Sequence, residues 1–220
     1  MDDQATSMNR FRSLGILPFV FFLSQAIHYW HIGEFGQVLW MCNIGNLVLA
    51  IGIFLNEKTV IRVAAIWMVP GVLVWIAYVV PTWGILFTGQ ASLGQLFGVL
   101  SSTLAHLGGF SVGMLILRRV RMDNRAWVFA FAWYFVLQLI SRMATPAPMN
   151  VNVSQQIQAG WESSFSAYWK FWAVLTVLVA VCLWVLATFL KLVWPDRVGG
   201  LPIAESSVGE PEPGSNESGV

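Results

Sequence analysis

The residues best suited to covalent chemistry in this sequence are Cys42 and His106, which lie in two separate apolar stretches. A cysteine thiolate attacks esters, and a histidine within hydrogen-bond reach can take the thiol proton and return it to the leaving alkoxide. A cysteine in an apolar helix more often behaves as a small hydrophobic residue, and a buried histidine is often only a satisfied structural group. The pair is therefore a hypothesis that depends on whether the two side chains share one site.

Amide and hydroxyl side chains close to the pair are candidates to support it. They are Asn43, Asn46, Ser102 and Thr103. An amide beside Cys42 could donate a hydrogen bond to an oxyanion that forms on an ester carbonyl. The two hydroxyls stand four and three residues before His106, so on a helix either of them could orient the imidazole.

Two further groups carry charge or metal-binding side chains near the ends of apolar stretches. His28, His31 and Glu34 are spaced so that a helix places the two histidines on one face, which is compatible with metal ligation. The alternative is that these three residues are simply solvated.

Arg142 could hold a lipid phosphate as a bidentate donor, or extend its charge to the membrane interface, and both readings stay open.

The elements that position these residues are expected to be membrane helices. Of the 220 residues, 57% are apolar and 10% are charged, against about 45–50% and about 25% in ordinary soluble domains. A soluble chain this short cannot bury so much apolar surface, which excludes a soluble enzyme and a disordered protein. The net charge of +1 provides no electrostatic footprint for nucleic acid.

Six stretches are apolar over the roughly 20 residues that a membrane helix needs. They are residues 11–30, 36–55, 60–80, 95–117, 126–142 and 168–194. We therefore expect an all-α, polytopic bundle of six transmembrane helices in residues 1–195. Residues 196–220 are rich in Pro, Gly, Ser and Glu and are predicted to form a disordered cytoplasmic tail. The first stretch also resembles a signal peptide, whose cleavage would leave five spans.

The distribution of lysine and arginine predicts the orientation. Ten of these residues flank one side of the predicted spans, and only Arg142 and Lys170 lie toward the other. Both termini should therefore be cytoplasmic in a multi-pass protein of the cell membrane. This topology places most polar residues of the spans in the outer half, which predicts a polar chamber open outward or sideways. A stripe of small residues on the fourth span predicts close helix packing: Ser101, Ala105, Gly109 and Gly113.

The order of these motifs resembles that of the YwaF-like integral membrane proteins. Residues 38–44 resemble the family segment Leu-His-Leu-Cys-Asp/Asn, although Trp40 and Met41 stand where the family has His-Leu. Residues 101–106 resemble its Ser/Thr-rich helix with a histidine, and residues 145–152 its outer loop with Pro and Asn. The resemblance implies an intramembrane acyltransferase with a Cys nucleophile and a His base. The related androgen-induced hydrolases use Thr and His on fatty-acid esters.

The function expected from the sequence is acyl transfer or ester hydrolysis on membrane lipids, without a cofactor, by Cys42 and His106. The first alternative is a non-enzymatic protein that binds or passes a small solute or a lipid. The second is a metal or haem site built from His28, His31 and His106. Membrane lipids are the expected partners, nucleic acid is not, and homo-oligomerisation stays open.

Overall fold

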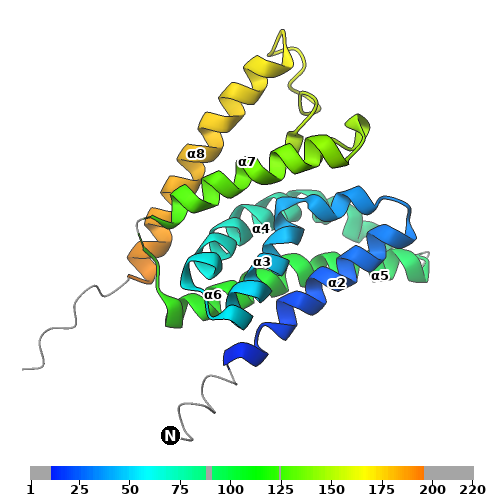
Figure 1. Cartoon of the computed structure of the whole chain (residues 1–220). Coiled ribbons are helices and arrows are strands. Elements are labelled where there is room, and N and C mark those ends of the chain that lie inside the picture. The colour runs from blue at the N-terminus through cyan, green and yellow to red at the C-terminus, as the bar shows by residue number, and fades with distance from the viewer. Residues whose placement is uncertain (1–10, 88–90, 124, 196–220) are drawn as a thin grey trace, which may run out of the picture.

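The computed structural model describes residues 11–87, 91–123 and 125–195, and this part of the chain is all-helical (Figure 1). Its α-helices are α2 (Ile16–His31), α3 (Met41–Leu55), α4 (Lys58–Phe87), α5 (Leu93–Thr103), α6 (Gly109–Val120), α7 (Ala126–Ala144) and α8 (Tyr168–Val193). A π-helical turn, η2 (Leu104–Gly108), joins α5 to α6. Three 3-10 turns lie in the connections: η1 (Phe35–Leu39), η3 (Ala147–Met149) and η4 (Val151–Val153). The predicted tail, residues 196–220, lies outside the described residues.

Within the described ranges, five helical stretches are long and apolar enough to cross a membrane. They are Phe11–His31, Lys58–Ala77, Leu93–Val120, Ala126–Ala144 and Tyr168–Val193. These stretches coincide with five of the six predicted spans.

The remaining predicted span, residues 36–55, is wrong in its first part. Trp40 adopts an extended backbone (φ −55°, ψ 136°), so the chain leaves η1 and begins a new helix at Met41. Helix α3 has 15 residues and is therefore about 22 Å long, which is less than the roughly 30 Å of a bilayer core. At the start of the helix, the Met41 N–H donates to Oδ1 of Asn152 at 3.0 Å.

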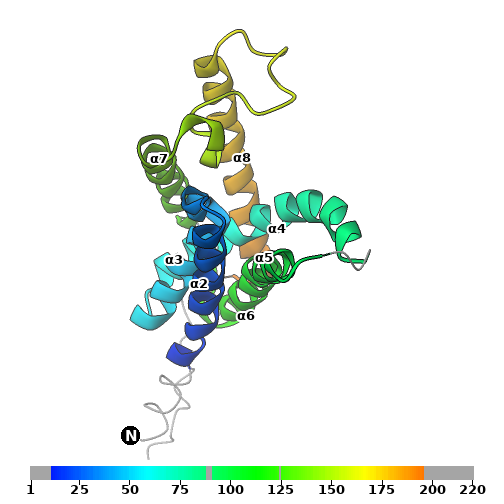
Figure 2. The ribbon, with the colours of Figure 1, turned by 90° about the vertical axis from the view of Figure 1, so that its right-hand side faces the viewer.

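The helices pack around two apolar clusters, one between α4, α6, α7 and α8 and one at an end of the bundle. There, the end of α3 and the start of α4 pack against α6 through fully or nearly fully buried side chains: Leu49, Ile53, Ile61, Ala64, Ile116 and Val120. Helices α7 and α8 lie beside the group formed by α2 to α6 in both views (Figures 1 and 2). Most of α8 presents apolar side chains outward, as expected for a helix that faces lipid.

The predicted small-residue stripe is confirmed, since all four of its members are buried between helices. The Ser101 hydroxyl donates to Oε1 of Gln25 on α2 at 2.9 Å. A Cβ atom on Gly109 would lie 2.2 Å from Oδ1 of Asn46 on α3, so only glycine permits this approach.

Candidate functional site

A cavity of about 860 Å³ lies at the end of the bundle where α2 ends and α3, α5 and α8 begin. Several of its lining residues are polar: Gln25, His28, Glu34, Gln37, Cys42, Asn43, Gln95, Ser102, His106, Asn152 and Gln158. Aromatic rings supply much of the remaining wall: Tyr29, Trp40, Trp67, Trp75 and Tyr134. Polar residues from separate helices thus line one cavity. One apolar cluster lies at the opposite end of the bundle, and a second reaches the cavity wall at Met41, Trp67 and Tyr134.

Cys42 enters this cavity as the second residue of α3. Its side chain packs against Gly71 of α4, where an added Cβ would lie 3.0 Å from the Cys42 Cβ. The first backbone N–H groups of a helix have no carbonyl one turn earlier to bond. In this helix Trp40 accepts from the N–H groups of Asn43 (2.9 Å) and Ile44 (3.0 Å). The backbone N–H groups of Cys42 and Asn43 both lie within hydrogen-bond reach of the Cys42 sulfur. The thiol therefore lies beside backbone donors.

Asn152, which the sequence did not single out as a site residue, holds the start of α3 in place. Its Oδ1 accepts from the Met41 N–H at 3.0 Å, and its Nδ2 donates to the Leu39 carbonyl at 2.7 Å and to the Ser141 hydroxyl at 2.8 Å. Asn152 has φ 53° in the left-handed region, which asparagine tolerates better than most residues. The pair of asparagines at positions 150 and 152 was the available signal, since both adopt this conformation.

His106 lies in the π-helical turn η2, a type of helix irregularity that is frequent at functional sites. Its Nδ1 lies 2.8 Å from the carbonyl oxygen of Ser102. Because a carbonyl only accepts, Nδ1 carries the proton and the neutral ring keeps its lone pair on Nε2. The indole of Trp75 stacks on the imidazole, with ring centroids 5.6 Å apart and planes at 14°. The tautomer and the plane of the ring are thus both determined by its neighbours.

The hydroxyls of Ser102 and Thr103 do not orient this ring, contrary to expectation. The Trp75 Nε1 donates to the Ser102 hydroxyl at 3.0 Å, and the Thr103 hydroxyl donates to the Val99 carbonyl at 2.7 Å. A hydroxyl within a helix readily bonds a carbonyl of the preceding turn, which is why Thr103 is occupied there. Ser102 acts instead through its main-chain carbonyl and through Trp75.

Asn46 connects the helix of Cys42 to the turn of His106. Its Nδ2 donates to the carbonyl oxygens of Cys42 at 3.1 Å and of Ala105 at 2.8 Å. Both oxygens bond one nitrogen, so they lie at most about 6 Å apart, and the backbones of Cys42 and His106 are neighbours. No hydrogen bond joins the two side chains themselves among the described residues.

The two asparagines expected to donate to an oxyanion use their amide nitrogens elsewhere. Asn46 is occupied as above, and Nδ2 of Asn43 donates to the Gln37 carbonyl at 3.0 Å. The backbone N–H of Cys42 is a donor beside the thiol. Asn43 instead presents a buried Oδ1 that has no partner in the described structure, and the residue lines the cavity.

The predicted metal group is only partly brought together. His28 and Glu34 line the cavity, whereas His31 is exposed and lies outside its lining. Among the described residues, no group of three or more His, Cys, Asp or Glu side chains is close enough to hold a metal ion.

Arg142 also lies outside the lining of the cavity. It donates to the Ser154 carbonyl at 2.9 Å and lies over the ring of Tyr168, 5.6 Å from its centroid. These contacts join α7 to the loop before α8.

Comparison of this chain with known protein families, with curated proteins and with solved structures finds no match. Function must therefore be inferred from the chemistry of the cavity.

Proposed function

We propose that this protein transfers or hydrolyses the acyl groups of membrane lipids, with Cys42 as nucleophile and His106 as general base. The observation that carries the proposal is that both residues line one cavity while Asn46 holds their backbones side by side. The resemblance of residues 38–44 and 101–106 to segments of YwaF-like proteins supports the same pair.

The proposed location is the cell membrane, with both termini cytoplasmic and α3 as a sixth, shorter membrane helix. Five apolar stretches and the outward apolar face of α8 support insertion. Described cations cluster at the helix ends opposite the cavity: Lys58, Arg62, Arg118, Arg119, Arg121, Arg125 and Lys191. Because cytoplasmic ends are rich in Lys and Arg, the cavity would lie in the outer half of the membrane.

In the proposed first step, the Cys42 thiol proton moves to His106 Nε2 and the sulfur attacks the ester carbonyl carbon. The negative charge on the carbonyl oxygen is stabilised by the backbone N–H of Cys42. The C–O bond then breaks, and His106 returns the proton to the leaving alkoxide, which leaves a thioester on Cys42. The stacked indole of Trp75 stabilises the imidazolium that forms in between.

In the second step, a lipid hydroxyl or a water attacks the thioester carbon and His106 takes its proton. The C–S bond then breaks, and His106 returns the proton to the leaving thiolate, which regenerates the thiol. The unpartnered Oδ1 of Asn43 offers an acceptor for the attacking hydroxyl. A hydroxyl lipid as acceptor produces transfer, and water produces hydrolysis. Arg142 stays a candidate for the lipid phosphate, because the residue is exposed beside the loop that ends at α8.

The test measures acyl exchange between phospholipids in vesicles that contain the purified protein. Cys42→Ala and His106→Ala should each lower the rate by about a thousandfold or more, since both act in the chemical step. Cys182→Ala and His31→Ala are matched controls, because both residues are exposed and outside the cavity lining. Unchanged exchange in Cys42→Ala would overturn the proposal.

A second candidate is binding or passage of a small solute or lipid without chemistry. The volume of the cavity, about 860 Å³, is within the range of ligand sites and favours this reading equally. Solute efflux from vesicles that contain Cys42→Ala separates the two functions. Efflux that persists in this variant, with no acyl exchange in the wild type, would favour passage.

A further inference from the structure

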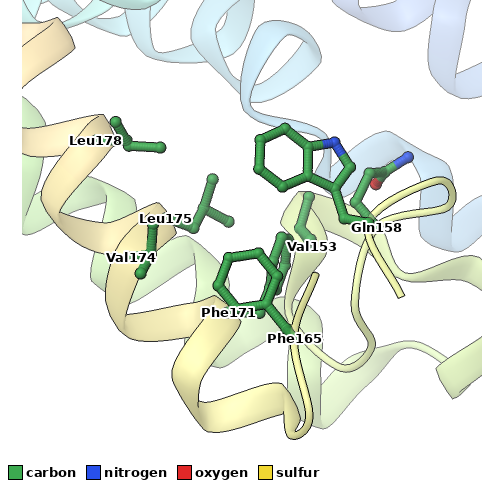
Figure 3. Close-up of a pocket in the computed structure, with 8 residues that line it drawn as sticks. Val153, Gln158, Phe165, Phe171, Val174, Leu175 and Leu178 are labelled. Atoms are coloured by element: carbon green, nitrogen blue, oxygen red, sulfur yellow. The ribbon is translucent and has the colours of Figure 1, made fainter. Parts of the chain in front are cut away.

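A second, smaller pocket lies between the loop before α8 and the first turns of that helix. It has a volume of about 190 Å³, and apart from Gln158 its lining is apolar. Figure 3 shows Val174, Leu175 and Leu178 of α8 on one side, facing Val153 and Gln158 of the loop. We refer to this hollow as the aromatic pocket, because three aromatic rings form the rest of its wall.

The rings of Trp161, Phe165 and Phe171 form a compact cluster. Trp161 and Phe165 stack with centroids 6.1 Å apart, and Phe165 meets Phe171 edge to face at 5.3 Å. Phe171 is buried although its neighbours Trp169 and Lys170 are exposed. The wall is thus preformed, and apart from Gln158 it offers no polar side chain to a ligand.

The aromatic pocket adjoins the cavity of Cys42. Val153, Gln158 and Leu175 line both hollows, so the two are adjacent. The reactive side chains of Cys42 and His106 lie in the larger cavity, and the most apolar walls lie in the smaller one. This arrangement matches a molecule with an ester group at one point and a hydrocarbon tail beyond it.

We propose that the aromatic pocket binds the terminal segment of the acyl chain of the lipid whose ester group lies at Cys42. The inference rests on the proposed function for the position of the ester, but the binding of the chain does not require chemistry. An apolar cavity of about 150 Å³ accepts benzene, so about 190 Å³ accommodates a chain end of roughly six to eight carbons. Chain length would thereby become a determinant of substrate choice.

The test uses photocrosslinking in vesicles of phosphatidylcholine that carries a diazirine near the methyl end of one acyl chain. A second probe, with the diazirine next to the glycerol, reports the other end of the lipid. The full-length protein is irradiated as wild type and as Cys42→Ala, which cannot consume the probe, and the adducts are mapped by peptide mass spectrometry. We expect the terminal probe to label the aromatic pocket, at Val153, Phe165 and Phe171, in both proteins.

Val174→Trp and Val177→Trp form a matched pair on α8. Val174 lines the aromatic pocket, whereas Val177 is 62% exposed and lies outside its lining. A buried methylene group is worth about fourfold in affinity, so a tryptophan that displaces two of them should lower labelling about tenfold or more. Val177→Trp should leave labelling unchanged.

Equal labelling in the two tryptophan variants, or adducts spread along the outer face of α8, would overturn the inference and indicate ordinary surrounding lipid. A labelled pocket without acyl exchange would support the pocket while contradicting the proposed function. Acyl exchange without labelling of the pocket would contradict the pocket alone.

Discussion

Asn46 of α3 donates a hydrogen bond of 2.8 Å to the carbonyl of Ala105, one residue before His106. The same nitrogen bonds the Cys42 carbonyl, and the Asn46 side chain is completely buried. A π-helical turn interrupts the regular hydrogen bonds of a helix, so a side-chain donor from a neighbouring helix stabilises it. This contact couples the position of the thiol to the position of the imidazole.

The close contact of Gly109 with Asn46 provides a first prediction. Gly109→Ala places a Cβ at 2.2 Å from Asn46 Oδ1 and forces the amide to move. We expect the free energy of unfolding in detergent to fall by about 1–3 kcal/mol, as in other overpacked cores. Gly113→Ala is the control, because its Cβ would meet no atom closer than 3.8 Å and alanine favours the helix by about 0.5–1 kcal/mol. Similar losses in both variants would contradict the role of this contact.

The hydrogen bonds of Asn152 at the start of α3 predict a change in the reactivity of Cys42. Asn152→Ala removes the acceptor of the Met41 N–H and two donor bonds, each worth about 1 kcal/mol. We expect the rate at which a membrane-permeant iodoacetamide alkylates Cys42 to change severalfold, because the N-terminus of α3 loosens. Asn150→Ala is the matched control in the same loop, since the Asn150 side chain bonds only within that loop. An equal change in both variants would indicate general loosening of the loop instead.

The stack of Trp75 on His106 predicts a loss of rate without a loss of lipid binding. Trp75→Leu removes the ring that fixes the imidazole plane and the donor to the Ser102 hydroxyl. Misplacing a catalytic group by about 1 Å can cost about a hundredfold, so we expect kcat for acyl exchange to fall by about tenfold to a hundredfold at similar KM. Trp75→Phe should recover part of the rate because it keeps a ring. Trp184→Leu, at an exposed tryptophan of α8, should have no effect.

Much of the architecture could be predicted because apolar length alone identifies a membrane helix. Five spans agree with the described helices, and the stripe that contains Gly109 packs as its spacing predicted. The gathering of Cys42 and His106 in one cavity was also predictable in outline, because alternating helices bring the polar halves of the spans to the same end.

The finer geometry could not be read from the sequence. The break at Trp40 is accompanied by a hydrogen bond from the Met41 N–H to Asn152, a residue 111 positions away in the sequence. The π-helical turn at His106 leaves no recognisable pattern in the sequence, because the apolar residues around it are typical of a continuous helix. Trp75 was hidden for the same reason, since one tryptophan among apolar residues predicts packing and not a partner for an imidazole.

The most direct measurement of the central claim is the intact mass of the purified protein after brief incubation with a phospholipid of defined acyl chains. The account predicts an added mass of one acyl group, located on Cys42, removed by neutral hydroxylamine and absent from Cys42→Ala but present in Cys182→Ala. Formation of the adduct should be much slower in His106→Ala. Acyl exchange that proceeds with no such adduct, or an adduct that persists in Cys42→Ala, would contradict the assignment of Cys42 as nucleophile.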